Sequence, residues 1–201
     1  MNRLEALEAI YPDISGCVVV TIMGAVAAEL YSLGHRANFF YLEHAMGLAS
    51  SMGLGIALAR PHEKVVVLDG DGSVLMNLGA YTTLARYAPP NLVHLVFDNE
   101  SLLSVGGFPT ATSCGSDLAG IAAAAGIQNV RSVRDRDVLR QDLRASLAGA
   151  RLSCIVAKVD ATGPKSFHMD ITMLENRFAF QRYFMGLDTA NRDKEESSHD
   201  L

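Results

Sequence analysis

Two short polar segments of this 201-residue chain follow apolar runs, and both carry oxygen atoms that could bind a metal. Gly70-Asp71-Gly72-Ser73 comes directly after the apolar run 65–68, and Asp98-Asn99 comes directly after the run 92–97. Carboxylate and amide oxygens are the ligands that a hard cation such as Mg²⁺ prefers. The glycines on either side of Asp71 allow main-chain amides to approach an anion closely. These residue types therefore favour a site for a metal-bound phosphate.

The two apolar runs are predicted to be neighbouring parallel strands. Three of the four residues in 65–68 are β-branched, which suits a central strand that is covered on both faces. Asn99 follows Asp71 by 28 positions, which leaves room for one helix, predicted at 77–87, and one returning strand. Ligands of open α/β sheets bind outside the carboxyl ends of the strands. We therefore expect Asp71 and Asn99 to share a cation there, beside a helix N-terminus that favours anions.

This pattern resembles the signature of thiamine diphosphate enzymes, a Gly-Asp-Gly closed by an Asn, in which Asp and Asn bind the Mg²⁺ that holds the diphosphate. Residues 46–51 (Met-Gly-Leu-Ala-Ser-Ser) and 98–110 extend the resemblance. They are similar to the diphosphate-binding half of phosphonopyruvate and sulfopyruvate decarboxylases. In the sulfopyruvate decarboxylases this half is a separate beta subunit. The resemblance covers roughly residues 3–185, which is nearly the whole chain.

The resemblance assigns the metal and the cofactor to particular residues. It implies that Asp71, Asn99 and the backbone carbonyl of Ser101 bind Mg²⁺, with diphosphate and water oxygens completing about six ligands. It places the polarisable thioether of Met46 beneath the bent cofactor, and it makes the backbone carbonyl of His44 the acceptor for the cofactor's 4′-amino group. The cofactor contacts that it implies are Gly24, His44, Met46, Gly70, Gly72, Ser73, Asn99 and Ser101.

The two candidate catalytic residues each have an alternative interpretation. Met46 could be an ordinary core methionine, and His44 could be a hydrogen-bonded loop histidine or a residue for proton transfer or substrate binding. The chain also departs from the family in one turn, where Met23 and Val26 replace hydroxyl residues that contact the diphosphate. Thr21 is the nearby hydroxyl that remains.

By resemblance, the reaction is the non-oxidative decarboxylation of a 2-oxo acid. Leu102 and Leu103 stand where phosphonopyruvate members carry His-Glu, so the substrate stays open. The side chains of His44, Ser104 and Thr110 are compatible with a sulfonate, phosphonate or carboxylate tail. The alternatives are an acetolactate-synthase-like carboligase half and a subunit that binds the cofactor without turnover.

A further alternative is a haloacid-dehalogenase-like phosphatase, because Asp69-Gly70-Asp71 also matches an Asp-x-Asp loop in which Asp69 would be the nucleophile. Such phosphatases usually open the chain with this strand and need an acidic pair at a later strand end. The later strand is followed by Lys158-Val159-Asp160, which lacks a clear pair. We therefore rank this interpretation below the thiamine diphosphate enzymes.

The resemblance also predicts a partner. Thiamine diphosphate enzymes bind the aminopyrimidine on a second domain whose glutamate promotes the imino form, and this chain has the length of one such domain. None of its own glutamates is predicted to reach that position. We therefore expect a separate pyrimidine-binding alpha subunit in a hetero-oligomer, α₂β₂. The segment 46–60, rich in small residues, is predicted to be a helix that faces this partner or one that packs closely on the sheet.

Composition narrows the class of protein. The net charge of −5 argues against nucleic-acid binding. No apolar run reaches the length of a membrane span and no signal peptide is recognisable, so a cytoplasmic location is expected. The three cysteines, which have no metal-ligand spacing, are expected to be buried free thiols.

The predicted fold is a three-layer, doubly wound α/β domain with a mainly parallel sheet of about six strands. Helical and strand patterns alternate along the chain, and the last predicted helix covers 171–185. The domain is expected to occupy residues 1–185. Residues 186–201, rich in Asp, Glu, Lys and Ser, are predicted to form a disordered acidic tail.

Overall fold

The computed structural model describes the backbone of residues 1–199 and the side chains of residues 1–189. Its centre is a six-stranded sheet in the order β2-β1-β3-β4-β8-β7, and all of its neighbouring strands are parallel. The predicted sheet of six parallel strands is therefore confirmed. The strands are β1 (Val18–Ile22), β2 (Phe39–Leu42), β3 (Val65–Gly70), β4 (Leu92–Asp98), β7 (Asn129–Val133) and β8 (Ser153–Lys158).

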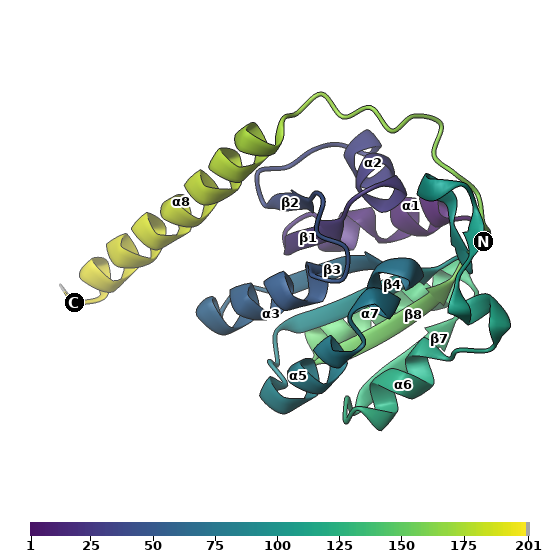
Figure 1. Ribbon diagram of the computed structural model, residues 1–201. Helices are drawn as coiled ribbons and strands as arrows, with labels where there is room; N and C mark the ends of the chain where they lie inside the picture. Colours follow the sequence, from purple (N-terminus) through teal and green to yellow (C-terminus); the bar gives the residue numbers. More distant parts are fainter. Residues whose placement is uncertain (200–201) are drawn as a thin grey trace.

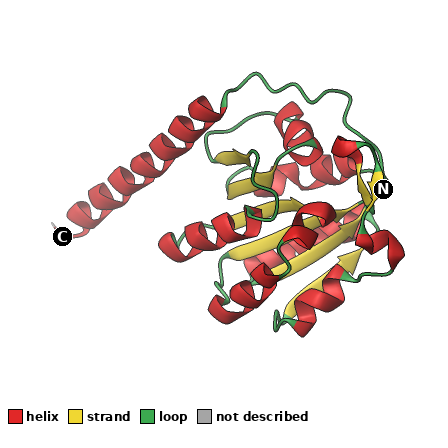
Figure 2. Cartoon of the chain, viewed as in Figure 1, coloured by secondary structure: helices red, strands yellow, loops and turns green. Residues whose placement is uncertain are grey.

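Helices cover both faces of this sheet, which makes three layers (Figures 1 and 2). Right-handed crossovers place α3 (Ala49–Ala59), α5 (Gly79–Tyr87) and α6 (Leu118–Ala124) on one face. On the other face α1 (Arg3–Ile14) contacts both α2 (Ala25–Ser32) and α7 (Arg136–Ala148). The direction of winding reverses between β1 and β3, so the loops after these two strands leave toward opposite faces. This reversal is where an open α/β sheet forms its ligand crevice.

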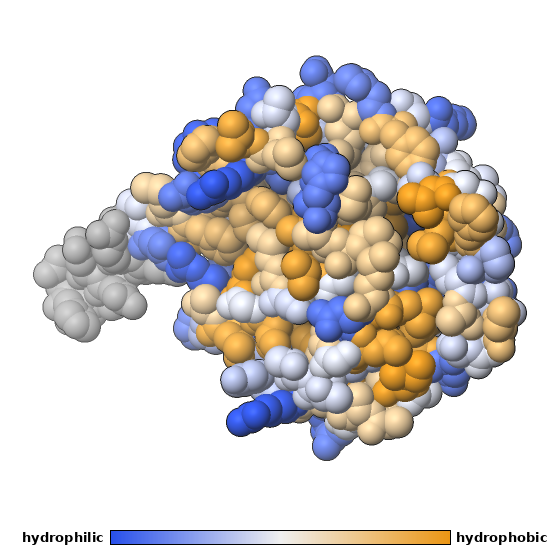
Figure 3. Space-filling view, in the orientation of Figure 1, coloured by the Kyte–Doolittle hydropathy of each residue, from blue (hydrophilic) through white to orange (hydrophobic). Residues whose placement is uncertain are grey.

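The helix rich in small residues packs directly on the sheet. A Cβ atom added to Gly53 of α3 would lie 2.2 Å from Cγ2 of Val67 in β3, so only glycine fits there. This confirms close packing on the sheet as one reason for the small residues. The opposite side of α3 is open at Gly55 and borders a groove of about 310 Å³ toward α5. Apolar and polar side chains are interspersed on the face of the molecule in Figure 3.

Two predicted helix boundaries are wrong. The helix predicted to begin at Met46 begins at Ala49, because Gly47 has φ +82° and cannot continue a helix. The helix predicted at 77–87 is preceded by a separate short helix, α4 (Asp71–Met76), that starts directly at the end of β3. Asn77 ends α4 with a backbone conformation that is not helical (φ −147°, ψ 58°), and α5 begins at Gly79. Asp71 therefore lies in the first turn of a helix rather than in a loop.

The C-terminal helix is longer than predicted. α8 (Met173–His199) continues through residues 186–199, which are helical where a tail without regular structure was predicted. No glycine or proline follows Gly186, so nothing local ends the helix. Asn176 ties α8 to the edge strand β2, since its side chain accepts from the amide of Tyr41 (3.0 Å) and donates to the carbonyl of Phe39 (2.8 Å). Residues 200–201 lie outside the described part, and the domain boundary at 185 stays a prediction.

The other expectations from composition have mixed outcomes. Within residues 1–199, none of the helices combines the length and the apolar character that crossing a bilayer would require. Cys17 and Cys154 are buried free thiols, as predicted. The prediction is wrong for Cys114, which is exposed because it ends the surface turn η2 (Ala111–Cys114).

Candidate active site

A cavity of about 220 Å³ opens at the carboxyl edge of the sheet, where the winding reverses. Five stretches of chain converge on it: the start of α1, the turn between β1 and α2, the loop before α3, the junction of β3 and α4, and the end of β4 with the loop after it. The cavity is lined by Arg3, Ile22, Met23, Gly24, Ala25, Val26, Met46, Gly70, Asp71, Gly72, Ser73, Phe97, Asn99, Ser101, Leu102, Leu103, Ser104 and Val105.

The two predicted metal ligands lie on this cavity together. In the parallel register of β3 and β4, Gly70 pairs with Phe97, so Asp71 and Asn99 leave neighbouring strand ends. Both side chains are buried and both line the cavity. The amide of Ser101 donates to Oδ1 of Asn99 (3.1 Å), which orients the Asn99 side chain and brings Ser101 to the same wall. Their convergence at one strand edge matches the expectation from spacing.

The carboxylate of Asp71 is held from one side by the loop after β4. Thr110 Oγ1 donates to Oδ2 of Asp71 at 2.5 Å, and Thr112 Oγ1 lies 3.3 Å from the same oxygen. Burial raises the pKa of Asp71 above its usual value and the nearby charge of Asp98 adds to this effect, whereas the hydrogen bonds from the two threonines oppose it. Asp98 is paired with Lys158 (2.6 Å), so Asp71 is the buried carboxylate whose charge a divalent cation could compensate.

The backbone around the cavity fits a diphosphate. The N-cap residues of α2 and α4 are Gly24 and Gly70, which have no side chain to accept from the amides of the first turn. Gly24 has φ +81°, a conformation that glycine adopts without strain. A Cβ added to Gly72 would lie 2.2 Å from Cδ2 of Leu102. Uncapped amides and glycines that open the cavity wall are what close approach of an anion requires.

The loop that carries Met46 is fixed by the residues after β3. The amide of Gly47 donates to Oγ of Ser73 (3.0 Å), and Nδ2 of Asn77 donates to the carbonyl of Gly47 (2.9 Å). Met46 is partly buried and faces the cavity. Ser73, a predicted cofactor contact, therefore uses its hydroxyl to hold the Met46 loop against the strand end.

Several candidate side chains do not reach the cavity. The side chain of His44 is exposed, on a residue with φ +53°, and it is not part of the cavity lining. Thr21 is fully buried and donates to the carbonyl of Ile22 (2.8 Å). Thr110 is committed to Asp71, so its hydroxyl is not free for a substrate. Of the three side chains considered for the substrate tail, Ser104 alone lines the cavity.

The geometry excludes Asp69 as the nucleophile of a phosphatase. Its side chain is only 1% exposed and does not line the cavity. Oδ2 of Asp69 pairs with Nε2 of the equally buried His94 (3.2 Å), and Oδ1 accepts from the amide of Gly70 (2.9 Å). Asp69 therefore stabilises the end of β3 from within the core, whereas Asp71 faces the cavity.

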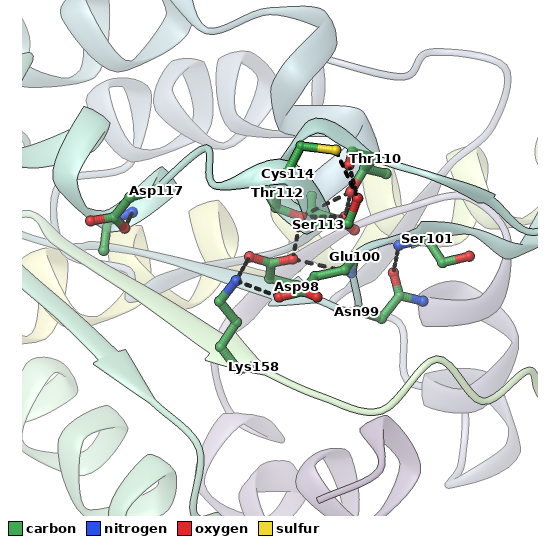
Figure 4. A network of polar contacts seen from close by, with 12 residues as sticks. Asp98, Asn99, Glu100, Ser101, Thr110, Thr112, Ser113, Cys114, Asp117 and Lys158 are labelled. Carbon is green, nitrogen blue, oxygen red and sulfur yellow. Dashed lines mark hydrogen bonds and ion pairs between the residues drawn. The ribbon is translucent and has the colours of Figure 1, made fainter.

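Three polar groups at the site were missed in the sequence. Arg3 lines the cavity and forms a buried pair with Glu29, Nε to Oε2 at 2.7 Å and Nη2 to Oε1 at 3.1 Å. Lys158 lies 2.6 Å from Oδ2 of Asp98 (Figure 4). Thr112 joins the carboxylates of Asp71 and Asp98. Of the three, only Arg3 could have been recognised from the sequence, because its helical spacing places it on the same inward side of the first helix as the buried Leu7 and Ile10.

Solved structures share this fold. Benzoylformate decarboxylase from Polynucleobacter necessarius superimposes with a TM-score of 0.67 at 19% identity, covering 82% of this chain and 34% of that one. A putative thiamin diphosphate-dependent enzyme from Mycobacterium smegmatis gives a TM-score of 0.63 at 24% identity, covering 79% of this chain and 31% of that one. At such identities the likeness concerns the fold alone.

Relatives found by sequence comparison have higher identities to this chain than these solved structures. Phosphonopyruvate decarboxylase of Streptomyces hygroscopicus is 41% identical over 171 residues, which cover 85% of this chain and 39% of that protein. The beta subunit of sulfopyruvate decarboxylase from Methanocaldococcus jannaschii is 32% identical over 180 residues, covering 89% of this chain and 95% of the subunit. The chain therefore spans about two fifths of the phosphonopyruvate enzyme and nearly all of the beta subunit.

The family model described as "Thiamine pyrophosphate enzyme, C-terminal TPP binding domain" matches residues 20–157. This range includes the strand ends of β1, β3 and β4, and with them both predicted metal ligands. Together with the relatives above, the match establishes that the chain belongs to the thiamine pyrophosphate enzymes, as their C-terminal TPP-binding domain.

Proposed function

We propose that this chain is the diphosphate-binding subunit of a thiamine diphosphate- and Mg²⁺-dependent decarboxylase that acts on a 2-oxo acid of the sulfopyruvate or phosphonopyruvate type. The observation that carries the proposal is the convergence of Asp71, Asn99, Gly24 and Met46 on one cavity at the strand edge. The curated relatives, named as sulfopyruvate and phosphonopyruvate decarboxylases, support the substrate class.

The chain's own residues would hold the cofactor in a defined posture. Asp71, Asn99 and the carbonyl of Ser101 would bind Mg²⁺, and the uncapped amides beside Gly24 and Gly70 would bind the diphosphate. Bound thiamine diphosphate supplies an electron sink for the loss of CO₂. The apolar wall of Phe97, Leu102 and Leu103 would exclude water from the reacting carbon.

Met46 would set the bend of the cofactor from below. Its loop is anchored at Gly47 by Ser73 and Asn77, so the thioether is supported by groups of the strand end itself. His44 would contact the cofactor's 4′-amino group through its backbone carbonyl, since its side chain is exposed. A role of that imidazole in proton transfer would require a partner chain to cover it.

We propose further that the working enzyme is a hetero-oligomer, in which a pyrimidine-binding alpha subunit contributes the catalytic glutamate. Relatives of nearly the same length are named as beta subunits, which supports this arrangement. The open side of α3 and its groove toward α5 offer an apolar surface for the alpha subunit. Leu58 and Tyr87 are exposed there.

The deciding experiment measures CO₂ release from a panel of 2-oxo acids. The full chain should give no release above background with saturating cofactor and Mg²⁺, and release from sulfopyruvate or phosphonopyruvate should appear when it is assembled with a pyrimidine-binding subunit. Robust activity of the chain alone would refute the split arrangement. Product analysis separates the alternatives, since a carboligase forms a hydroxyketone instead of an aldehyde, and a non-catalytic subunit binds cofactor without releasing CO₂.

A further inference from the structure

The carboxylate of Asp71 has two unequal oxygens. Oδ2 accepts the Thr110 hydroxyl at 2.5 Å, which is the distance of a strong charge-assisted hydrogen bond. Among the residues that the structure describes, no side chain donates to Oδ1. Both Asp71 and Thr110 are buried, with exposed fractions of 3% and 5%. The carboxylate therefore has one oxygen that a threonine hydroxyl holds and one that no described side chain holds.

Thr110 is itself held in place on several sides. Its amide donates to the carbonyl of Glu100 (3.1 Å), and its hydroxyl oxygen lies 2.8 Å from that of Thr112. Oγ1 of Thr112 is also 2.8 Å from Oδ1 of Asp98, at the end of β4, and its single proton is donated either to Asp98 or to Thr110. The chain of contacts ends at Lys158 of β8, which lies 2.6 Å from Asp98 and 3.1 Å from Glu100 (Figure 4).

This chain of contacts resists rotation of the carboxylate. To turn Oδ2 toward the cavity, Asp71 would have to give up the Thr110 hydrogen bond inside a buried network, and hydrogen bonds to charged groups are stronger than those between neutral groups. Because Asp98 and Lys158 belong to the central strands β4 and β8, the threonines cannot simply follow the carboxylate. The loop after β4 thus acts as a clamp on one oxygen of Asp71.

We propose that Thr110, positioned by Thr112, restricts Asp71 to ligating a metal through a single oxygen and thereby favours Mg²⁺ over Ca²⁺. Mg²⁺ takes about six oxygens in a strict octahedron, which a carboxylate joins through one oxygen. Ca²⁺ takes about six to eight, and its carboxylate ligands bind through one or both oxygens. Thr110 is here a positioning residue for metal selectivity. The inference rests on the proposed function, because that function supplies the metal.

The test compares metal affinities rather than activity. The full chain, at saturating thiamine diphosphate, is titrated with Mg²⁺ and with Ca²⁺ by calorimetry. In Thr110→Val the ratio of the Ca²⁺ Kd to the Mg²⁺ Kd should fall about tenfold, because the freed Oδ2 can join a Ca²⁺ site. Thr110→Ser keeps the donor and should retain the wild-type ratio. Thr82→Val makes the same substitution on the exposed side of α5 and should also retain it.

Other outcomes overturn the inference in distinguishable ways. Equal weakening of both metals in Thr110→Val would assign Thr110 a general structural role and contradict the selectivity role. An unchanged ratio would contradict it as well. Should Thr110→Val fail to fold, Thr110→Ala removes the donor with less crowding and carries the same expectation. If the wild-type chain binds neither metal with the cofactor, either alone or assembled with a pyrimidine-binding subunit, the proposed function is refuted, and this inference with it.

Discussion

The two walls of the cavity are positioned by different means. On the sheet side, Asp71 and Asn99 continue strands that lie in the centre of the sheet and are buried along their length. On the loop side, residues 100–114 form a two-residue antiparallel pair, β5 (Ser101–Leu102) with β6 (Phe108–Pro109), and two short 3₁₀ turns. That loop exposes Val105 and Phe108 and is tied to the sheet side by the threonine hydroxyls.

The difference indicates where precision at this site comes from. Backbone hydrogen bonds of a parallel ladder fix the sheet side, and such a ladder changes little when one side chain is replaced. A few side-chain hydrogen bonds fix the loop side, so single substitutions there can release it. We therefore expect substitutions on the sheet side to remove cofactor binding without unfolding the chain. Substitutions where the two walls touch should instead alter how the cofactor and the metal ligands are placed.

The largest effect is expected from removing a metal ligand on the sheet side. Asp71→Ala or Asn99→Ala should abolish Mg²⁺-dependent binding of thiamine diphosphate, a loss of more than about 100-fold, because the metal anchors the diphosphate. Calorimetric titration with and without Mg²⁺ measures this loss. Thermal unfolding should change little, since both side chains lie outside the apolar core. Unchanged cofactor affinity in both variants would contradict the assignment of Asp71 and Asn99 as Mg²⁺ ligands.

A smaller and more selective effect is expected at the loop before α3. Met46→Ala should lower turnover of the assembled enzyme about 10- to 100-fold, because a reacting group misplaced by about 1 Å costs that much. The Kd for the cofactor should stay within about threefold, since the metal and the amides still hold the diphosphate. Met52→Ala, at a partly buried methionine of α3, serves as the control for lost packing. Normal turnover with lowered stability would identify Met46 as an ordinary core residue.

The sheet side could be predicted from the sequence because its signals are local. Runs of β-branched residues mark the strands, and Gly70-Asp71-Gly72 and Asn99 stand directly at their ends. The loop side depends on contacts between distant residues. Nothing near Thr110 indicates that the loop folds back onto Asp71, 39 positions earlier.

The boundary errors have equally physical causes. The sequence predicts a helix only from residue 77, because the glycines at 70 and 72 disfavour one before it, yet the chain enters α4 directly at Asp71. The length of α8 depends on charged residues that are good helix formers but give no amphipathic pattern. The buried pair of Asp69 and His94 could not be recognised, because a carboxylate next to a functional one looks like a second candidate.

The contact between the two walls can be tested by crowding it. In Gly72→Ala the new methyl would lie 2.2 Å from Cδ2 of Leu102, so the Leu102 side chain must move. Because Cδ2 is the free end of a partly buried side chain, we expect a loss of at most about 1 kcal/mol in the free energy of unfolding, with weaker cofactor binding. Gly55→Ala is the matched control, because its added methyl has no atom within 4 Å and should be neutral or stabilising. Recovery in Gly72→Ala/Leu102→Ala would confirm the contact, and full additivity would contradict it.

The smallest effect on cofactor affinity is expected from the buried polar pair of Asp69 and His94, which lies in the core behind the strand ends. His94 is buried against Asp69 of β3, with Tyr81 of α5 and Cys154 of β8 beside it. Burial alone would lower the pKa of His94, but its contacts with Asp69 and Cys154 outweigh burial and raise that pKa from 6.5 to about 9. Burial raises the pKa of Tyr81, so its hydroxyl stays neutral while His94 titrates.

The sign of the resulting pH dependence follows from linkage. Because the folded-state pKa of His94 lies above its unfolded value, the charged imidazole contributes stability that is fully present below pH 6.5 and is lost as the pH rises through about 9. His94→Gln keeps a donor for Asp69 but cannot titrate. Urea unfolding from pH 6 to 9.5 should therefore show the wild type losing its advantage over His94→Gln as the pH rises. Cofactor affinity should stay within about twofold throughout, because the pair lies below the strand ends rather than on the cavity. A difference between the two proteins that is constant with pH would show that the pKa of His94 is the same in the folded and the unfolded chain, and wild-type stability that rises relative to His94→Gln from pH 6 upward would show that His94 is neutral in the folded chain.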